Sequence, residues 1–303
     1  MISTPHGRFL VLLIAFLAMS VGIASAGSPF SSVVKGPLTE LRLTPADAAA
    51  EPEFGRSVAM GSDLVAVGDS GDGSIGAAYL YRRLGATYVL EKKLDFPEPV
   101  PDDCLVAKET EDPEDEFGLC PEFGRTVAIQ GNRVFVGARF APVDGLHAGA
   151  VYVFHKQGTS WIPDAKIVSP TPEAEDNFGR ALAIQGNLLV VTARKEDQAT
   201  SDVGGAYVYT CDGGSWTFRQ KLTGSDASSG AYFGQSVALQ GDLMAVGARN
   251  ANPNSAGGFY LFRKAGGVWT ETAKVTPPGG KKNDQYGFTM AFAGDTLAVG
   301  ARR

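Results

Sequence analysis

The chain has 303 residues, of which 27 are basic and 33 acidic, for a formal net charge of −6. This mildly acidic balance, without any cluster of basic residues, lacks the electrostatic footprint of a nucleic-acid binder and argues against docking on an anionic membrane surface. We therefore expect neither kind of partner.

The first residues resemble a secretory signal. Arg8 precedes the apolar run 9–24, which ends in the small residues Ala24, Ser25 and Ala26. This pattern predicts a signal peptide over residues 1–26, with cleavage after Ala26. The alternative is an uncleaved anchor, but the run is short for a membrane span, which needs about 20 apolar residues. We expect an exported protein, either secreted, periplasmic or on the cell surface, with no membrane span after cleavage.

Three cysteines follow this segment. Cys104 and Cys120 flank an acidic insertion, 97–121, and we expect them to form a disulfide in an oxidising compartment. Closing a loop of about 15 residues is worth about 3 kcal/mol in the loop-entropy model. Cys211 is left over and is interpreted as an inert thiol, because no base lies near it in the sequence.

Residues 27–53 contain one short strand pattern, 38–43 (LTELRL), and then a linker. After it, an aromatic residue followed by glycine recurs at separations of 69, 55, 55 and 53 residues. A fixed period of this size indicates a repeat architecture. The five pairs are Phe54-Gly55, Phe123-Gly124, Phe178-Gly179, Phe233-Gly234 and Tyr286-Gly287, and a residue type present in every copy is expected to be structural.

Each repeat divides into four segments of strand length. The aromatic-Gly pair opens the first segment, and a turn such as Gly131-Asn132 or Gly186-Asn187 leads to the second. Gly followed by Asn or Asp between apolar runs is a strong hairpin signal. The second segment, for example LLVVT, is apolar on both faces, which suits a strand buried between stacked sheets.

The third and fourth segments carry a fixed set of aromatic and basic residues. The third begins with glycine and has tyrosine at its fourth position, and the fourth has an aromatic residue and then a lysine five residues later. Arg42-Leu43 fits the end of a fourth segment. The tyrosines are Tyr79, Tyr152, Tyr207 and Tyr260, and the lysines are Lys93, Lys166, Lys221 and Lys274.

Four antiparallel strands per repeat predict an all-β chain built of β-propeller blades. The FG starts, the VGAR or VGD ends of the second strands and the G-[AG]-x-Y-[VL]-[YF] third strands resemble the FG-GAP repeat family, known from the propeller of integrin alpha subunits. The resemblance covers residues 38–303 and implies one propeller over 27–303. Its blades span approximately 54–105, 123–170, 178–224 and 233–277, with a partial fifth at 286–303.

The fifth repeat supplies only its first two strands. In the family the N-terminal strand completes the last blade, so we expect 38–43 to close the ring as a fourth strand. A third strand is then missing. Either the last blade is incomplete or the sequence belongs to a longer chain, such as a seven-bladed one. The second is favoured because an open sheet edge is a liability.

Calcium is the first functional candidate that the resemblance raises. Integrin repeats bind it in Asp-rich loops between strands one and two, whereas the turns here are too short to wrap the six to eight oxygen ligands that the ion needs. We therefore expect no cofactor and no metal site. Asp69, Asp72, Asp197 and Asp202 remain possible oxygen donors, although Asp is also an ordinary turn residue.

Two sets of arginines recur. One set follows strand two (Arg139, Arg194, Arg249 and Arg302, with Asp69 in the first repeat), and the other follows FG (Arg56, Arg125 and Arg180). Either could form a ring that binds anions or carboxylates, but hydrogen bonds between blades are the favoured interpretation. Core packing is likewise favoured over a sugar-binding platform for the aromatic residues. The insertion 97–121 has no counterpart in other repeats, so it is either a solvated loop or a binding loop.

No catalytic motif is visible, and the only histidines after residue 26 are His147 and His155. We expect a non-enzymatic scaffold that binds an unknown protein or glycan ligand. The alternatives are a secreted propeller hydrolase or lyase that uses carboxylates near a central channel, and a blade array of a larger adhesin. Clustered acids at a channel mouth would favour the enzyme.

Overall fold

The structure is a computed structural model that describes residues 41–45, 53–101, 104, 119–198, 200–251 and 255–302. The predicted signal peptide, residues 38–40 of the predicted closing strand and most of the insertion 97–121 lie outside the described residues. In the described part of the chain, the regular structure is all-β apart from one three-residue 3-10 turn, Asp72–Ser74. None of the helical structure there has the length and apolarity that a membrane crossing requires.

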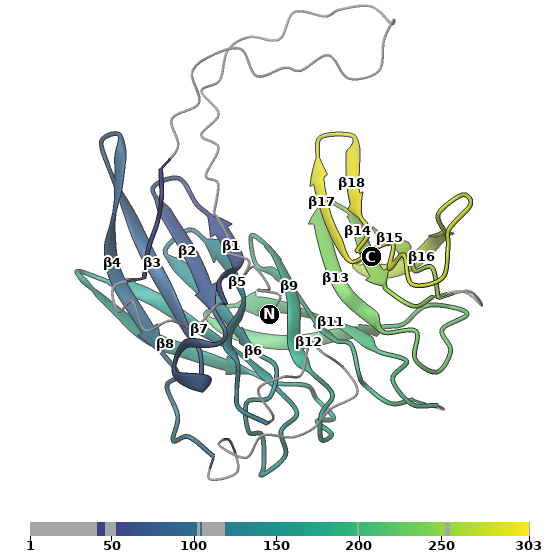
Figure 1. Cartoon of the computed structure of the whole chain (residues 1–303), viewed down its shortest axis with the longest axis horizontal. Helices are drawn as coiled ribbons and strands as arrows, with labels where there is room; N and C mark the ends of the chain where they lie inside the picture. Colours follow the sequence, from purple (N-terminus) through teal and green to yellow (C-terminus); the bar gives the residue numbers. More distant parts are fainter. Residues whose placement is uncertain are drawn as a thin grey trace, which may run out of the picture.

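The strands form four antiparallel sheets of four strands each and one two-stranded sheet (Figure 1). Within each sheet the strands pair in chain order, as predicted for propeller blades. Blade 1 consists of β1 (Phe54–Met60), β2 (Leu64–Asp69), β3 (Ala77–Leu84) and β4 (Thr87–Asp95). Blade 2 consists of β5 (Phe123–Gln130), β6 (Arg133–Ala138), β7 (Ala150–Gln157) and β8 (Ser160–Ile167).

The next blades repeat this order. Blade 3 consists of β9 (Phe178–Gln185), β10 (Leu188–Ala193), β11 (Gly205–Asp212) and β12 (Ser215–Leu222). Blade 4 consists of β13 (Phe233–Gln240), β14 (Leu243–Ala248), β15 (Gly258–Ala265) and β16 (Val268–Val275). Blade 5 consists of β17 (Thr289–Ala293) and β18 (Thr296–Gly300), so β17 begins three residues after the predicted start at Tyr286.

The predicted two-residue turns join strands one and two. Gly131 and Gly186 have φ values of 61° and 62°, and the flanking residues pair directly across each turn. Glycine adopts this left-handed conformation without the steric cost that a Cβ atom brings. The second strands that follow are buried along their whole length in blades 1 and 3, as their apolar sequences predict.

The hydrophobic core lies between neighbouring blades. One cluster joins blades 1 and 2, a second joins blades 2 and 3, and a third joins blades 3 and 4. The last aliphatic residue of the fourth strand packs on the following blade in blades 1 to 3: Leu94, Ile167 and Leu222 are each at most 5% exposed. This stacking explains how a chain of repeats folds without one large central core.

Leu43 takes the same position against blade 1. It is 8% exposed and packs with Val65, Val67 and Tyr79. The Tyr81 hydroxyl donates to the Thr44 carbonyl oxygen at 2.6 Å, as the equivalent Tyr209 donates to Val168 after strand four of blade 2. Leu43 and Thr44 thus lie against blade 1 where a preceding fourth strand would end, but residues 41–45 form no strand and the sheet of β17 and β18 has only two strands. The predicted closure of blade 5 by a fourth strand is therefore not seen in the described residues.

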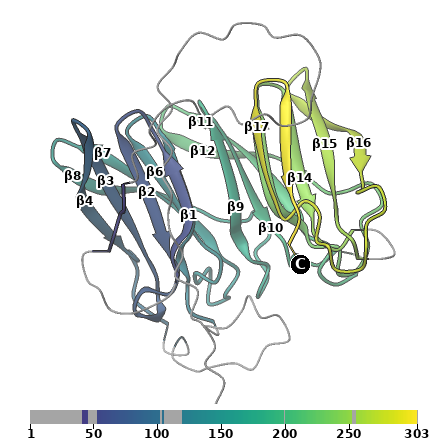
Figure 2. The ribbon, with the colours of Figure 1, turned by 45° about the horizontal axis from the view of Figure 1, so that its top comes forward.

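The first strand of each blade lies on the inside of the arrangement. β1 contacts β5, β5 contacts β9, β9 contacts β13, and β13 contacts β17. The sheets follow one another in chain order around an arc, and β1 and β17 lie on its inner side while β4 and β16 lie on its outer side (Figures 1 and 2). Residues from all five blades line one cavity of about 580 Å³, which is the central channel.

Candidate binding site: the central channel

An irregularity in every full blade directs a side chain into this channel. In blade 2, Phe123 pairs with Ala138 and Thr126 pairs with Gly137, so Gly124 and Arg125 form a bulge of two residues. The same shift occurs after Phe54, Phe178 and Phe233. A β-bulge bends a strand and redirects its side chains. The glycine permits the bend, because φ at Gly124 is 93°.

The residue after each FG glycine therefore lines the channel. Three of these residues are arginines, the fourth is glutamine and the fifth is aromatic, and Arg302 lines the same cavity. All three arginines of the predicted set after FG line the channel, whereas Arg302 alone does so among the arginines of the set after strand two. The five residues are Arg56, Arg125, Arg180, Gln235 and Phe288.

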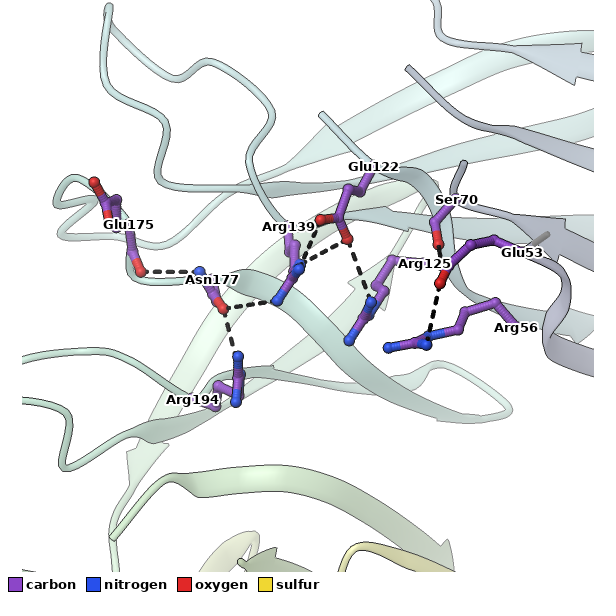
Figure 3. A network of polar contacts seen from close by, with 9 residues as sticks. All are labelled: Glu53, Arg56, Ser70, Glu122, Arg125, Arg139, Glu175, Asn177 and Arg194. Carbon is purple, nitrogen blue, oxygen red and sulfur yellow. Dashed lines mark hydrogen bonds and ion pairs between the residues drawn. The ribbon is translucent and has the colours of Figure 1, made fainter. Parts of the chain in front are cut away.

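Two glutamates lie beside these arginines, but each makes its shortest contacts elsewhere (Figure 3). Glu122 accepts from Arg139 at 2.6 and 2.7 Å and contacts Arg125 only at 3.4 Å. Glu53 accepts from the Ser70 hydroxyl at 2.5 Å and contacts Arg56 at 3.4 Å. Each of these two acids therefore shares its negative charge between a channel arginine and a second partner.

Arg125 shows the effect of burial beside other positive charges. The residue is 4% exposed. Burial, together with the positive charges of Arg139 and Arg180, holds the pKa of its guanidinium well below the usual value, against the opposing effect of Glu122. A bound negative group would favour the charged guanidinium and so oppose both effects on its pKa.

Gln235 occupies the equivalent position in blade 4. It is 1% exposed, and in the described part of the chain neither its amide oxygen nor its amide nitrogen has a hydrogen-bond partner. A buried amide without partners costs roughly 1–3 kcal/mol. Because the residue borders the channel, a ligand there can satisfy the amide once the side chain turns towards the cavity.

The arginines after strand two join blades instead. Arg139 is fully buried and donates to Glu122, which precedes its own blade, and at 3.5 Å to Asn177, which precedes the next blade. Arg194 donates to the same Asn177 oxygen at 3.3 Å. These contacts agree with the favoured prediction of hydrogen bonds between blades.

Tyr232 takes the position of Glu122 and Asn177 in blade 4. Its ring lies 5.4 Å from the Arg194 guanidinium and 4.5 Å from that of Arg249, so it stacks with arginines from two blades.

The sequence analysis placed Asp69 at the position of these arginines in blade 1, and this prediction was wrong. Phe54 pairs with Asp69 as Phe123 pairs with Ala138, so Ser70, and not Asp69, replaces the arginine in blade 1.

The four candidate oxygen donors lie as two separate pairs, Asp69 with Asp72 in blade 1 and Asp197 with Asp202 in blade 3. Asp72 accepts from the Tyr79 hydroxyl at 2.6 Å and pairs with Lys93 at 2.7 Å, and Asp197 accepts from the backbone of Asp202. Among the described residues, no three His, Cys, Asp or Glu side chains are grouped as metal ligands would be. Asp69 is 4% exposed, and burial followed by the charge of Asp72 raises its pKa to about 7.

Cys104 and Cys120 form the predicted disulfide, and both are buried. Cys211 is free and partly buried. The repeat-defining Phe123, Phe178 and Phe233 are fully buried, and their edge-to-face contacts with third-strand aromatics support core packing. Phe54 and Tyr286 are only partly buried.

His147 lies near the Phe140 carbonyl, and His155 lies beside Asp164. Neither histidine lines the channel.

Sequence reasoning missed two residues of this region. Glu122 differs in type from its counterparts Asn177, Tyr232 and Gln285, so the repeat alignment gave it no weight. Gln235 follows FG in the fourth repeat, where the first three repeats have arginine, and it was not singled out. That departure, in a series of arginines, was the available signal.

The family model described as FG-GAP repeat matches the chain at residues 39–81, 121–154, 161–209, 216–262 and 269–303. No sequence among the curated proteins matches significantly. Among solved structures, the chain is similar to a putative 6-phosphogluconolactonase from Bacteroides uniformis, with 12% identity and a TM-score of 0.47. That alignment covers 86% of this chain and 81% of the other, and at this similarity it carries no argument about activity.

Proposed function

The chain belongs to the FG-GAP repeat family, and from that premise we propose that it is an exported, non-enzymatic β-propeller scaffold that binds a protein or glycan ligand at its central channel. The blades form the rigid part of this scaffold. The residue after each FG glycine provides the contact surface.

The composition of the channel carries this proposal. Each of the five blades contributes its first strand to one cavity, and its volume of about 580 Å³ lies in the range of ligand sites. Glu53 is the only acidic residue among the described residues that line it. A glycosidase of the usual type needs two carboxyl groups that flank the scissile bond. The lining thus supports binding rather than hydrolysis by channel carboxylates.

The enzyme alternative would need a protonated carboxyl group in the channel. Asp69 and Asp176 have a pKa raised to about 7, chiefly by burial, as a general acid requires. However, neither residue lines the channel. Their raised pKa values are explained by burial beside other acids at the blade junctions.

A role as a blade array of a larger adhesin has one observation in its favour. Val58 and Met60 on β1 are 41% and 55% exposed, whereas the equivalent Val127 of blade 2 is 5% exposed against blade 1. A partner surface would cover this face of blade 1. Further FG-GAP repeats in the same reading frame would support this second function.

The binding function can be tested with arrays of glycans and proteins and a variant that fills the channel. Val58 is exposed and lines the channel, so Val58→Trp narrows it without disturbing a packed contact. Val268→Trp is the matched control, because Val268 is 54% exposed on the outer strand β16. We expect Val58→Trp alone to lose binding. Equal binding by both variants, or turnover of a bound glycan, would contradict the proposal.

A further inference from the structure

The channel combines positive charge, an unsatisfied amide and apolar side chains. From this combination we propose that it binds a sugar acid, with the carboxylate held by the channel arginines and the hydroxyl groups by Gln235. The inference rests on the proposed binding function and specifies its ligand, either as a free uronate or as a uronate unit of an acidic glycan.

Positively charged side chains outnumber negatively charged ones in the lining of the channel. The described lining contains four guanidinium groups, from Arg56, Arg125, Arg180 and Arg302, and one carboxylate, from Glu53. Glu53 accepts a hydrogen bond from the Ser70 hydroxyl, and both oxygens of Glu122 accept from Arg139. The channel is thus positive in a protein whose net charge is −6. Arginine binds carboxylates through pairs of parallel hydrogen bonds.

The amide of Gln235 defines a second requirement. Its nitrogen donates hydrogen bonds and its oxygen accepts them, and both atoms lack partners among the described residues. A carboxylate only accepts, so it can satisfy the nitrogen but not the oxygen. A ligand hydroxyl can do both. The ligand therefore needs hydroxyl groups next to its acid group, which is the chemistry of a sugar acid.

The remaining lining suits the apolar face of a sugar ring. Leu182 and Val237 are half-buried and alternate with the polar positions along β9 and β13, whereas the equivalent Val127 of β5 packs on blade 1. A volume of about 580 Å³ accommodates a small ligand or the end of a chain rather than a folded partner. These features favour a uronate over an acidic protein surface.

Calorimetric titration of the exported protein at low ionic strength tests the inference. The probes are glucuronate, glucose as its uncharged counterpart, oligogalacturonate as a glycan form and a poly-glutamate peptide. We expect glucuronate to bind at least about tenfold more tightly than glucose, because only the carboxylate forms charge-assisted hydrogen bonds with the arginines. Binding should weaken with added salt.

Two channel variants and one control define the site. We expect Arg180→Gln to weaken glucuronate binding about tenfold or more, whereas Arg219→Gln on β12, which pairs with exposed Asp212, should leave it unchanged. Gln235→Leu should also weaken binding but raise the melting temperature, because it removes a buried amide without partners. A merely structural glutamine would give the opposite change in melting temperature.

Each other outcome overturns the inference. Binding of glucuronate that neither channel variant alters would place the site elsewhere. Tighter binding of poly-glutamate than of both uronates would assign an acidic peptide instead. If array ligands bind in a manner sensitive to Val58→Trp while uronates do not bind, this inference fails and the scaffold function stands. If no array ligand binds, the scaffold function itself fails.

Discussion

At the scale of single residues, Arg139 shows how the blades are held together. It is fully buried, and its guanidinium is satisfied by Glu122 before blade 2 and Asn177 before blade 3. Arg194 repeats this arrangement with Asn177 and Tyr232. Each arginine therefore links two successive blades, and the partner side chain can vary because both amides and aromatic rings accept a guanidinium.

Glu122→Gln should destabilise the protein by about 3–5 kcal/mol, because it leaves the buried charge of Arg139 without its counterion. Urea unfolding measures this change. Asp212→Asn is the matched control, since it breaks an exposed ion pair with Arg219 that is worth about 1 kcal/mol or less. Equal effects of the two substitutions would contradict the account.

The buried acids give the stability an unusual dependence on pH. Burial, followed by the charge of Asp72 and Glu53 against that of Lys93, raises the pKa of Asp69 to about 7. Burial, followed by Glu196 and Glu173 against Lys221, does the same for Asp176. Both groups bind more protons in the folded than in the unfolded protein between about pH 4 and 7. Stability should therefore fall as the pH rises through this window.

Glu91 acts in the opposite direction. Hydrogen bonds from Arg82, Lys156 and Trp161 lower its pKa to about 2. Its contribution to the free energy of unfolding is therefore fully present above about pH 4.5 and is lost as the pH falls towards 2. We expect maximal stability between pH 4 and 5 in urea titrations. Asp176→Asn should reduce the decline between pH 5 and 7, and an undiminished decline in that variant would refute the assignment.

At the scale of elements, the FG pair is a joint between blades. The backbone N–H of Phe123 donates to the Ile75 carbonyl of blade 1 at 2.8 Å, and Phe178 and Phe233 donate to the preceding blades in the same way. The glycine that follows allows the close approach, because a Cβ atom on Gly124 would lie 2.1 Å from the Ala77 carbonyl oxygen.

Gly124→Ala should therefore cost at least about 3 kcal/mol, since the new methyl group meets rigid backbone of blade 1 in addition to the strain of a positive φ. Gly131→Ala is the control, because Gly131 also has a positive φ but a Cβ atom there meets open space. It should cost about 1–2 kcal/mol. Thermal unfolding distinguishes the two, and similar losses would rule out the close contact as the cause.

Much of the arrangement of strands into blades could be predicted from the sequence. The fixed period, the Gly-Asn turns and the apolar second segments are local signals, and they gave the blades and most strand positions. The direction of the side chain after FG could not be predicted, because it depends on a two-residue bulge that ordinary alternation does not describe. The error over Ser70 was avoidable, because Ser70 and Arg139 lie at the same distance in sequence after the FG phenylalanine. The partners of Arg139 depend on contacts between blades.

At the scale of the whole molecule, the short turns between strands one and two exclude the loops in which integrin repeats bind calcium. We therefore expect millimolar calcium to leave the melting temperature unchanged. A ligand that binds only the folded state must raise it. A calcium-dependent increase that chelation reverses would show that a metal site exists after all.

The central claim concerns the channel, where the residue after each FG glycine brings positive charge from successive blades to one place. The most direct measurement is a crystal structure of the protein soaked in bromide, an anion that anomalous scattering locates. The account predicts the strongest bromide peak between Arg125, Arg180 and Gln235. Bromide found only on the outer surface, with these three side chains directed away from a common cavity, would contradict it.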